Sequence, residues 1–410
     1  MNNDVLKIFM LGYGGANNTG SEIRILTIID DVRAVFGDSI NITLGTLDRE
    51  KTSKIINETE YLKIVEIPYI FPLAVWRLAK KHNILMLIEG STFKDNWSSA
   101  LLYLFLWGGW AAKRHGKYSL AYAVDAGQMS SINQYLTRLV CQEMDLIITR
   151  TKAAKQKLHD LGIQREIFVT TDTAFQFQYH PVETTNVPVV GIAPVEFYKW
   201  PVHFKLWGPR ELCYHWPYYF SWDSDRAQQS EILVEAWVKL IQHIINERGW
   251  RIKLIAMEEL DRNICNRILD RVQPQISLQI EKSFAGERSP QDIANELQRL
   301  SFLVTSRYHA CVLSMNGGVP QMALYHDERL SSIYQELGLS DYAVEIGRPD
   351  LFCNLKKIFE QLVLNAPFVS ERLCNRFHSY YLPSSKSNRE ILKNWYQDAI
   401  IKKESRQNDL

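Results

Sequence analysis

The fold class is indicated by one stretch of the chain, Thr305-Ser306-Arg307-Tyr308-His309-Ala310-Cys311, which continues as VLSMNGGVPQMAL to Leu324. It predicts the end of a strand (302–305), a tight turn, a helix, and then a second strand after Gly317-Gly318-Val319-Pro320. Arg307 and His309 stand where the first strand gives way to the helix.

Open α/β folds bind ligands just beyond the carboxyl ends of their strands, where helix N-termini offer free N–H groups and partial positive charge. A guanidinium and an imidazole at this position predict an anion-binding site. A salt-bridged Arg307 beside a buried His309 is the alternative, and the sequence leaves it open.

The first half of the chain alternates between strands and helices. A strand at 5–11 leads into a loop rich in glycine and asparagine (12–20), and Ser21 opens a helix with an apolar stripe. Further strands are predicted at 40–46, 64–67, 84–88, 119–124 and 145–149. The run 84–88 is wholly apolar, which indicates a parallel sheet covered on both faces. Residues 1–180 are therefore predicted to form one doubly wound domain.

The same pattern restarts after an aperiodic segment, 177–188, which is predicted to be a linker. The second domain is predicted to span 188–345. Its expected elements are strands at 189–193, 252–256 and 277–280 and helices at 230–248, at 261–272 and from Ser289-Pro290 onward. A C-terminal helical segment, 346–410, follows with helices at 351–364 and 389–402. We predict an α/β fold of two Rossmann-like domains facing across a cleft, the GT-B-like arrangement, with C-terminal helices.

The segment 196–222 of the second domain is dense in aromatic residues, prolines and cations, and no helix or strand period fits it. We expect a large loop. Its aromatic side chains either bury themselves against the domain or form a lid or sugar platform, because aromatic faces pack on pyranose rings.

The run SRYHACVLSMNGGVPQMALYHDERLSSIYQELGL (306–339) resembles the C-terminal signature of the polysaccharide pyruvyl transferase family. In that family an S-R-x-H-A helix start precedes a G-V-P strand, a Y-x-D turn and an E-L-G helix. Two weaker similarities lie upstream. Asn18, Gly20 and Glu22 match the family's G-N-x-G-D-E loop, and 169–175 is similar to its D-P-A-F segment. Departures are Ser21 in place of Asp, Thr173 in place of Pro, and Glu89 and Ser91 in a turn that is usually G-G-G.

The resemblance implies transfer of the pyruvyl group of phosphoenolpyruvate onto a sugar diol of a cell-surface polysaccharide or exopolysaccharide precursor, with a ketal as product and phosphate released. Such chemistry needs a basic clamp for the donor's carboxylate and phosphate and a proton donor for its methylene carbon. It assigns Arg307 to the clamp and His309 to the phosphate or the proton, because imidazole titrates near neutral pH.

Further substrate-binding residues follow from the same resemblance. Asn18, Gly20 and Glu22 are expected to contact the substrate from the N-terminal loop. A second donor-binding cation is also expected, and its candidates are Lys199, Arg210 and Arg329. No metal cluster and no cofactor are expected. Phosphoenolpyruvate is the expected donor substrate, and the expected acceptor is a saccharide, of which a lipid-linked form is one alternative.

Two other classes of function remain open. A nucleotide-sugar glycosyltransferase uses the same architecture, with Glu328 or Glu336 as candidate contacts to the ribose. A non-catalytic glycan-binding relative is suggested by Glu89 and Ser91 in place of glycines.

Composition narrows the partners and the compartment. In 410 residues, 47 Lys and Arg balance 46 Asp and Glu, so no global field favours nucleic acid. Six scattered cysteines without C-x-x-C spacing predict reduced thiols, hence the cytoplasm, and no zinc site. No signal peptide is recognised. The uncharged stretch 96–112 is shorter than the roughly 20 residues of a spanning helix. It predicts a buried helix, with peripheral association at the inner face of the cell membrane as the alternative.

Overall fold

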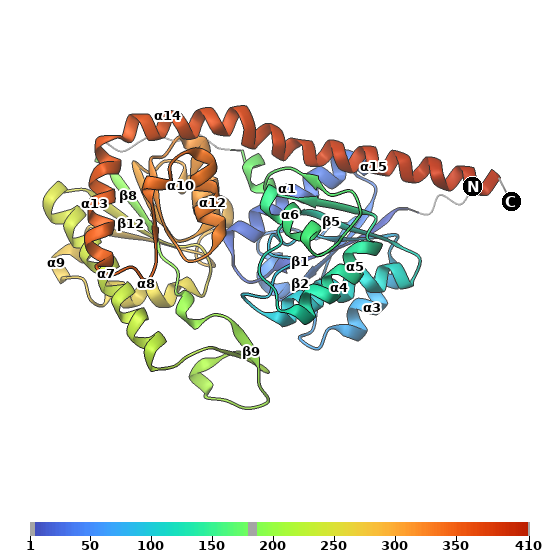
Figure 1. Ribbon diagram of the computed structural model, residues 1–410, viewed down its shortest axis with the longest axis horizontal. Helices are drawn as coiled ribbons and strands as arrows, with labels where there is room; N and C mark the ends of the chain where they lie inside the picture. The colour runs from blue at the N-terminus through green and yellow to red at the C-terminus, as the bar shows by residue number, and fades with distance from the viewer. Residues whose placement is uncertain (1–4, 179–186, 409–410) are drawn as a thin grey trace. The chain divides into compact units, whose positions relative to one another are not determined.

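The computed structural model describes residues 5–178 and 187–408, so most of the predicted linker (177–188) lies outside the described residues (Figure 1). The chain divides into two compact units. The first contains the described residues up to Ala16, Ser21–Gln176 and the residues from Tyr381 onward. The second contains Asn17–Gly20 and the described part of Phe177–Tyr380.

The first unit is built on a seven-stranded sheet in the order β3-β2-β1-β4-β5-β6-β7, in which every neighbouring pair is parallel. Its order places β1 and β4 at the point where the connections reverse direction, which is where doubly wound sheets bind ligands. The strands are β1 (Lys7–Gly14), β2 (Asn41–Thr46), β3 (Leu62–Glu66), β4 (Ile84–Leu87), β5 (Tyr118–Val124), β6 (Leu146–Thr149) and β7 (Phe168–Val169).

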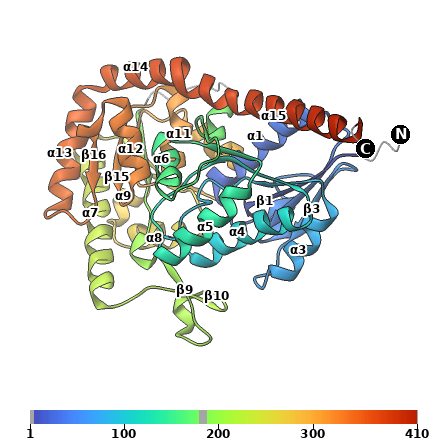
Figure 2. The same ribbon diagram turned by 45° about the vertical axis from the view of Figure 1, so that its right-hand side comes forward.

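Helices cover both faces of this sheet (Figures 1 and 2). Ile8 and Met10 of β1 pack with α1 and α15, while Phe9 and Leu11 pack with α3, α4 and α6, because successive side chains of a strand point to opposite faces. This explains why the strands read as continuous apolar runs. The helices are α1 (Thr19–Phe36), α2 (Arg49–Ser53), α3 (Pro72–Lys81), α4 (Ser99–Arg114), α5 (Ser131–Glu143), α6 (Lys152–Asp160) and α15 (Leu382–Asn408), with η1 (Thr173–Gln176) as a 3₁₀ turn.

The second unit contains a six-stranded parallel sheet in the order β13-β12-β8-β14-β15-β16. The predicted strands 189–193 and 302–305 have the same bounds in the structure, and they pair with one another at the centre of this sheet. The strands are β8 (Val189–Ala193), β12 (Arg251–Ala256), β13 (Ile280–Phe284), β14 (Phe302–Thr305), β15 (Gln321–Tyr325) and β16 (Ala343–Glu345).

Helices of the second unit connect these strands and extend beyond the sheet. The predicted helix 351–364 has the same bounds in the structure, whereas the helix predicted at 230–248 begins earlier, at Ser224, where Asp223 caps it. The helices are α7 (Ser224–Arg248), α8 (Asp261–Leu269), α9 (Pro274–Ser277), α10 (Pro290–Leu297), α11 (Tyr308–Ser314), α12 (Glu328–Leu337), α13 (Leu351–Leu364) and α14 (Ala366–Arg376), with the short turns η4 (Met315–Gly317) and η5 (Ser340–Tyr342) and the π-turn η6 (Phe377–Tyr381).

Two predictions about the second unit are wrong. The strand expected at 277–280 is replaced by the short helix α9, because Pro274 stands at its start and Ser277 bonds back to the Pro274 carbonyl oxygen, and β13 begins only at Ile280. The segment 196–222 is not a simple loop. It forms a small antiparallel sheet of β9 (Val202–Phe204), β10 (Cys213–His215) and β11 (Tyr218–Phe220), with short turns η2 (Phe197–Lys199) and η3 (Arg210–Leu212).

The apolar stretch around 96–112 forms α4, whose residues pack on the sheet as predicted. Among the described residues, no helix combines the length and the apolar character that crossing a membrane requires.

Candidate functional site

Arg307 and His309 stand at the junction of β14 and α11, where the sequence places them. Arg307 keeps an extended backbone and precedes the first helical residue, Tyr308. Its N–H donates to Oγ1 of Thr305 at 2.8 Å. Since the chain at Arg307 is not yet helical, its side chain projects beyond the carboxyl end of the strand.

The Arg307 guanidinium is engaged by two carboxylates of its own unit. Its Nε donates to Oδ2 of Asp261 at 2.8 Å and its Nη2 to Oδ1 of the same residue, which completes a bidentate pair. Nη2 also lies 3.0 Å from Oε2 of Glu258. Both acids follow β12. The sequence left open whether Arg307 forms salt bridges within the protein or is available to bind an anion. The structure shows Arg307 in salt bridges.

Burial governs the electrostatics of this cluster. The side chain of Asp261 is 2% exposed, and burial raises its pKa to about 6, against the lowering effect of Arg307. Burial acts to lower the pKa of Arg307, but Asp261 and Glu258 more than offset this and raise it above its ordinary value. Arg307 therefore stays charged, and one cation faces two acidic groups.

The loop between β1 and α1 is held against this cluster by its residues 17–20, which belong to the second unit. The Asn18 side chain donates to Oε2 of Glu258 at 3.1 Å, the same oxygen that pairs with Arg307. The Thr19 N–H donates to the Met257 carbonyl oxygen at 2.8 Å. Asn18 thus acts on Arg307 through Glu258.

Gly20 lies directly beneath the His309 ring. A Cβ atom on Gly20 would overlap Nδ1 and Cγ of His309, so only glycine permits this approach. The structure therefore brings together Arg307, His309, Asn18 and Gly20, four of the predicted substrate-binding residues. Glu22, the third matching residue of the N-terminal loop, is buried in the first turn of α1 and belongs to the first unit.

The three candidates for a second donor-binding cation differ in their burial and in their contacts. Arg329 pairs with Asp327, Nη2 to Oδ2 at 2.6 Å, at the start of α12. Lys199 is half-buried, and burial lowers the pKa of its amine, which lies 5.9 Å from the centre of the Phe220 ring. Arg210 is exposed in the small sheet's connection. Glu328 and Glu336 are both exposed on α12.

The aromatic segment 196–222 does not bury its tryptophans as a whole. Trp207 is 80% exposed and Trp216 is 58% exposed, and Phe204 of β9 is exposed as well. The alternative in which all the aromatic side chains of this segment are buried against the domain is therefore wrong. The rings that the small sheet presents to solvent can still serve as a platform for a saccharide.

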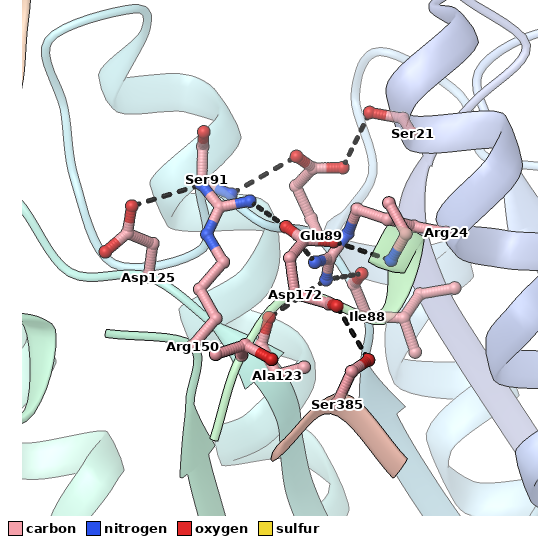
Figure 3. Close-up of polar contacts among 12 residues, drawn as sticks. Ser21, Arg24, Ile88, Glu89, Ser91, Ala123, Asp125, Arg150, Asp172 and Ser385 are labelled. Carbon is pink, nitrogen blue, oxygen red and sulfur yellow. Dashed lines mark hydrogen bonds and ion pairs between the residues drawn. The ribbon is translucent and has the colours of Figure 1, made fainter. Parts of the chain in front are cut away.

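A second charged cluster, which sequence reasoning missed, lies at the carboxyl ends of the strands of the first unit (Figure 3). Asp172 Oδ2 lies 2.8 Å from Nη1 of Arg24, in an ion pair, and accepts a hydrogen bond from Nη1 of Arg150 at 2.5 Å. Arg150 Nη2 also pairs with Oδ2 of Asp125 at 3.1 Å, and Lys94 lies 3.4 Å from the same oxygen. These five side chains are buried.

Glu89 extends this cluster toward α1. Its Oε2 accepts from the Ser21 hydroxyl at 3.4 Å, and its Oε1 accepts from the Ser91 N–H at 3.2 Å (Figure 3). Gly90 between them is required by Arg150, since a Cβ at that position would collide with the guanidinium. A charged residue follows each of the apolar strands β4, β5, β6 and β7 closely, and this was the available signal in the sequence.

Comparison with known proteins defines the class. The sequence model of the family described as polysaccharide pyruvyl transferase matches residues 31–328. The chain belongs to this family. No curated protein matches the chain significantly.

The fold is of the GT-B type and is similar to that of UDP-N-acetylglucosamine 2-epimerases. The enzyme from Neisseria meningitidis bound to UDP-GlcNAc has a TM-score of 0.58 at 10% identity, covering 96% of this chain and 100% of that one. The enzyme from Methanocaldococcus jannaschii has a TM-score of 0.58 at 13% identity, with the same coverage. At this identity the similarity concerns the fold alone.

Proposed function

We propose that the protein transfers the pyruvyl group of phosphoenolpyruvate onto two hydroxyl groups of a saccharide and releases phosphate. The match of the polysaccharide pyruvyl transferase family over residues 31–328 is the observation that carries this proposal. The junction of β14 and α11 supports it, because Arg307 and His309 are placed there with Asn18 and Gly20 of the family's N-terminal loop.

His309 is the proposed proton donor. Protonation of the methylene carbon of phosphoenolpyruvate makes the adjacent carbon electrophilic, and one sugar hydroxyl then adds to it and loses its proton. The second hydroxyl replaces the phosphate, which leaves with its bonding electron pair, and the ketal closes. Gly20 permits the close approach of the His309 ring, since a Cβ atom at that position would overlap it.

Arg307 is the proposed contact to the anionic donor, and its ion pairs decide which of its nitrogen atoms can make that contact. Its ion pairs with Asp261 and Glu258 use Nε and Nη2, which leaves Nη1 to reach the donor's carboxylate or phosphate. The acids thus orient the guanidinium while reducing its net attraction for an anion. The exposed rings of Trp207 and Trp216 are proposed to contact the saccharide.

Phosphate release from phosphoenolpyruvate in the presence of saccharides with neighbouring hydroxyl pairs tests the proposal, together with NMR detection of the new ketal methyl group. Thermal-shift titrations with phosphoenolpyruvate and with UDP-GlcNAc separate it from a nucleotide-sugar enzyme. Stabilisation by the nucleotide sugar alone, without phosphate release from phosphoenolpyruvate, would reject the proposed reaction. Binding of saccharide without turnover would instead indicate a glycan-binding protein.

A further inference from the structure

We infer that helices α3, α4 and α5 of the first unit form a docking surface for an anionic lipid bilayer. This inference concerns one face of that unit and does not depend on the proposed donor or on the residues around Arg307. Its apolar part is defined by six exposed side chains, namely Ile70, Leu73, Tyr103, Ile132, Tyr135 and Leu139.

The most regular portion of this surface is on α5. Ile132, Tyr135 and Leu139 are 71%, 61% and 48% exposed, and their spacing of three and four residues aligns them on one face of the helix. The opposite face carries Val140 and Cys141, which are buried against the sheet. The helix is thus apolar on both faces, which is unusual for a helix in contact with water only.

Neighbouring helices extend the same surface. Helices α3, α4 and α5 lie side by side in Figures 1 and 2, and α4 contacts both of the others. The Trp107 indole N–H donates to the Pro72 carbonyl oxygen at 2.9 Å, which holds the start of α3 against α4. Tyr103 precedes Trp107 by one helical turn on the same side of α4, and Leu73 is the second residue of α3.

The beginning of α5 is likewise tied to the beginning of α4. The Asn133 side chain donates to Oδ2 of Asp95 at 2.6 Å and to the Ser99 hydroxyl at 3.4 Å. Because these bonds join the N-terminal ends of the two helices, Ile132 lies beside the start of α4. The exposed apolar side chains therefore stand on three helices, of which α4 is in contact with the other two.

The charges of the three helices indicate which partner binds to this surface. The three helices contain the cations Arg77, Lys80, Lys81, Lys113, Arg114 and Arg138 and a single acid, Glu143, in a chain whose total charge is nearly balanced. A bilayer with anionic head groups offers both an apolar layer for Ile and Leu and negative charge for Lys and Arg, and tyrosine favours the boundary between the two. A second copy docking through the same face would bring like charges together.

Lys113 and Arg114 are already paired, with Asp145 and Glu143 respectively. The attraction for anionic lipid is therefore assigned to the four exposed cations that remain, Arg77, Lys80 and Lys81 of α3 and Arg138 of α5. All four stand on the same helices as Leu73 and Ile132.

Co-sedimentation of the full chain with vesicles tests the inference, with phosphatidylcholine vesicles compared to mixed phosphatidylcholine–phosphatidylglycerol vesicles. We expect binding to the mixed vesicles that weakens as salt is added. The triple variant Ile70→Ser, Ile132→Ser, Leu139→Ser should lose about tenfold or more in partitioning. Replacement of Arg77, Lys80 and Arg138 by Gln should cost about fivefold per charge on the mixed vesicles only.

Leu278→Ser combined with Leu364→Ser is the matched control, because both leucines are at least 80% exposed and belong to the second unit. This variant should bind vesicles as the unmodified protein does, and circular dichroism should show that all variants are folded. The inference is overturned by absence of binding to either vesicle, by equal losses in the control and the triple variant, or by self-association that the triple variant abolishes without any vesicle binding.

Discussion

Replacing Arg307 with methionine keeps a side chain of similar length but removes the charge that faces Asp261 and Glu258. The Asp261 carboxylate then loses a bidentate partner in a position that is 2% exposed. Removing one partner of a buried ion pair costs about 3–5 kcal/mol because the other charge remains without compensation. We expect a loss of that size in the free energy of unfolding near neutral pH.

The same loss should depend on pH in a defined direction. Burial raises the pKa of Asp261 to about 6 in the folded protein, above its ordinary value of 3.8. The stability that the protonated acid contributes at low pH is therefore lost as the pH rises through about 6. Arg307 lowers this pKa, and its removal must raise it further. Above pH 6 the Arg307→Met variant therefore continues to lose stability while the unmodified protein does not, by up to about 1.4 kcal/mol per pH unit.

Urea unfolding of both proteins at about pH 5 and about pH 8 measures this difference. The destabilisation should be clearly larger at the higher pH, and Asp261→Asn should remove much of the excess when it is combined with Arg307→Met. Equal destabilisation at the two pH values would refute the reasoning, since it would mean that Asp261 does not depend on Arg307 for its charge. Steady-state kinetics on these variants must be interpreted together with their stability.

The remaining predictions concern other contacts of the two clusters. Gly20→Ala should displace the His309 ring and lower kcat by roughly tenfold or more, with circular dichroism unchanged, whereas an unaltered kcat would separate His309 from the reaction. Asp172→Asn should reduce the free energy of unfolding by about 3 kcal/mol or more because it leaves two buried guanidinium groups without their shared acid, and urea unfolding measures this. Trp207→Ala should raise the KM for the saccharide by several-fold and leave the melting temperature nearly unchanged, because the ring is 80% exposed. Asp261→Asn should tighten phosphoenolpyruvate binding above pH 6, where the native acid is charged, and the two affinities, measured by calorimetry, should converge below pH 6.

The strands around the site were predictable from the sequence because burial on both faces leaves an unbroken apolar run. This holds for 189–193 and 302–305, whose bounds agree with the structure. The prediction failed at 277–280, where Ser277-Leu278-Gln279-Ile280 alternates as a short strand would, but Pro274 starts a short helix and Leu278 is 90% exposed. The regular small sheet within 196–222 was equally hidden, because its three-residue strands are too short to show a period.

The position of Arg307 was predictable, but its partners were not. Glu258 and Asp261 follow β12, so their place beyond a strand end could be foreseen. Their proximity to Arg307 depends on the strand order, in which only β8 separates β12 from β14. Strand order results from packing across the whole sheet and leaves no local mark on the sequence. The same reason explains why the pairing of Arg150 with Asp125 and Asp172 was missed.

Both units place charges beyond the carboxyl ends of parallel strands, yet the two arrangements differ in balance. In the first unit three cations (Arg24, Lys94, Arg150) face three acids (Glu89, Asp125, Asp172), and most of these groups are joined by ion pairs or hydrogen bonds. Such a compensated, buried cluster holds the strand ends in place. In the second unit one cation, Arg307, faces two acids, and burial raises the pKa of one of them, Asp261. We propose that an anion binds there once this excess negative charge is neutralised, and that Asp261, whose pKa is raised by burial, neutralises it by taking up a proton.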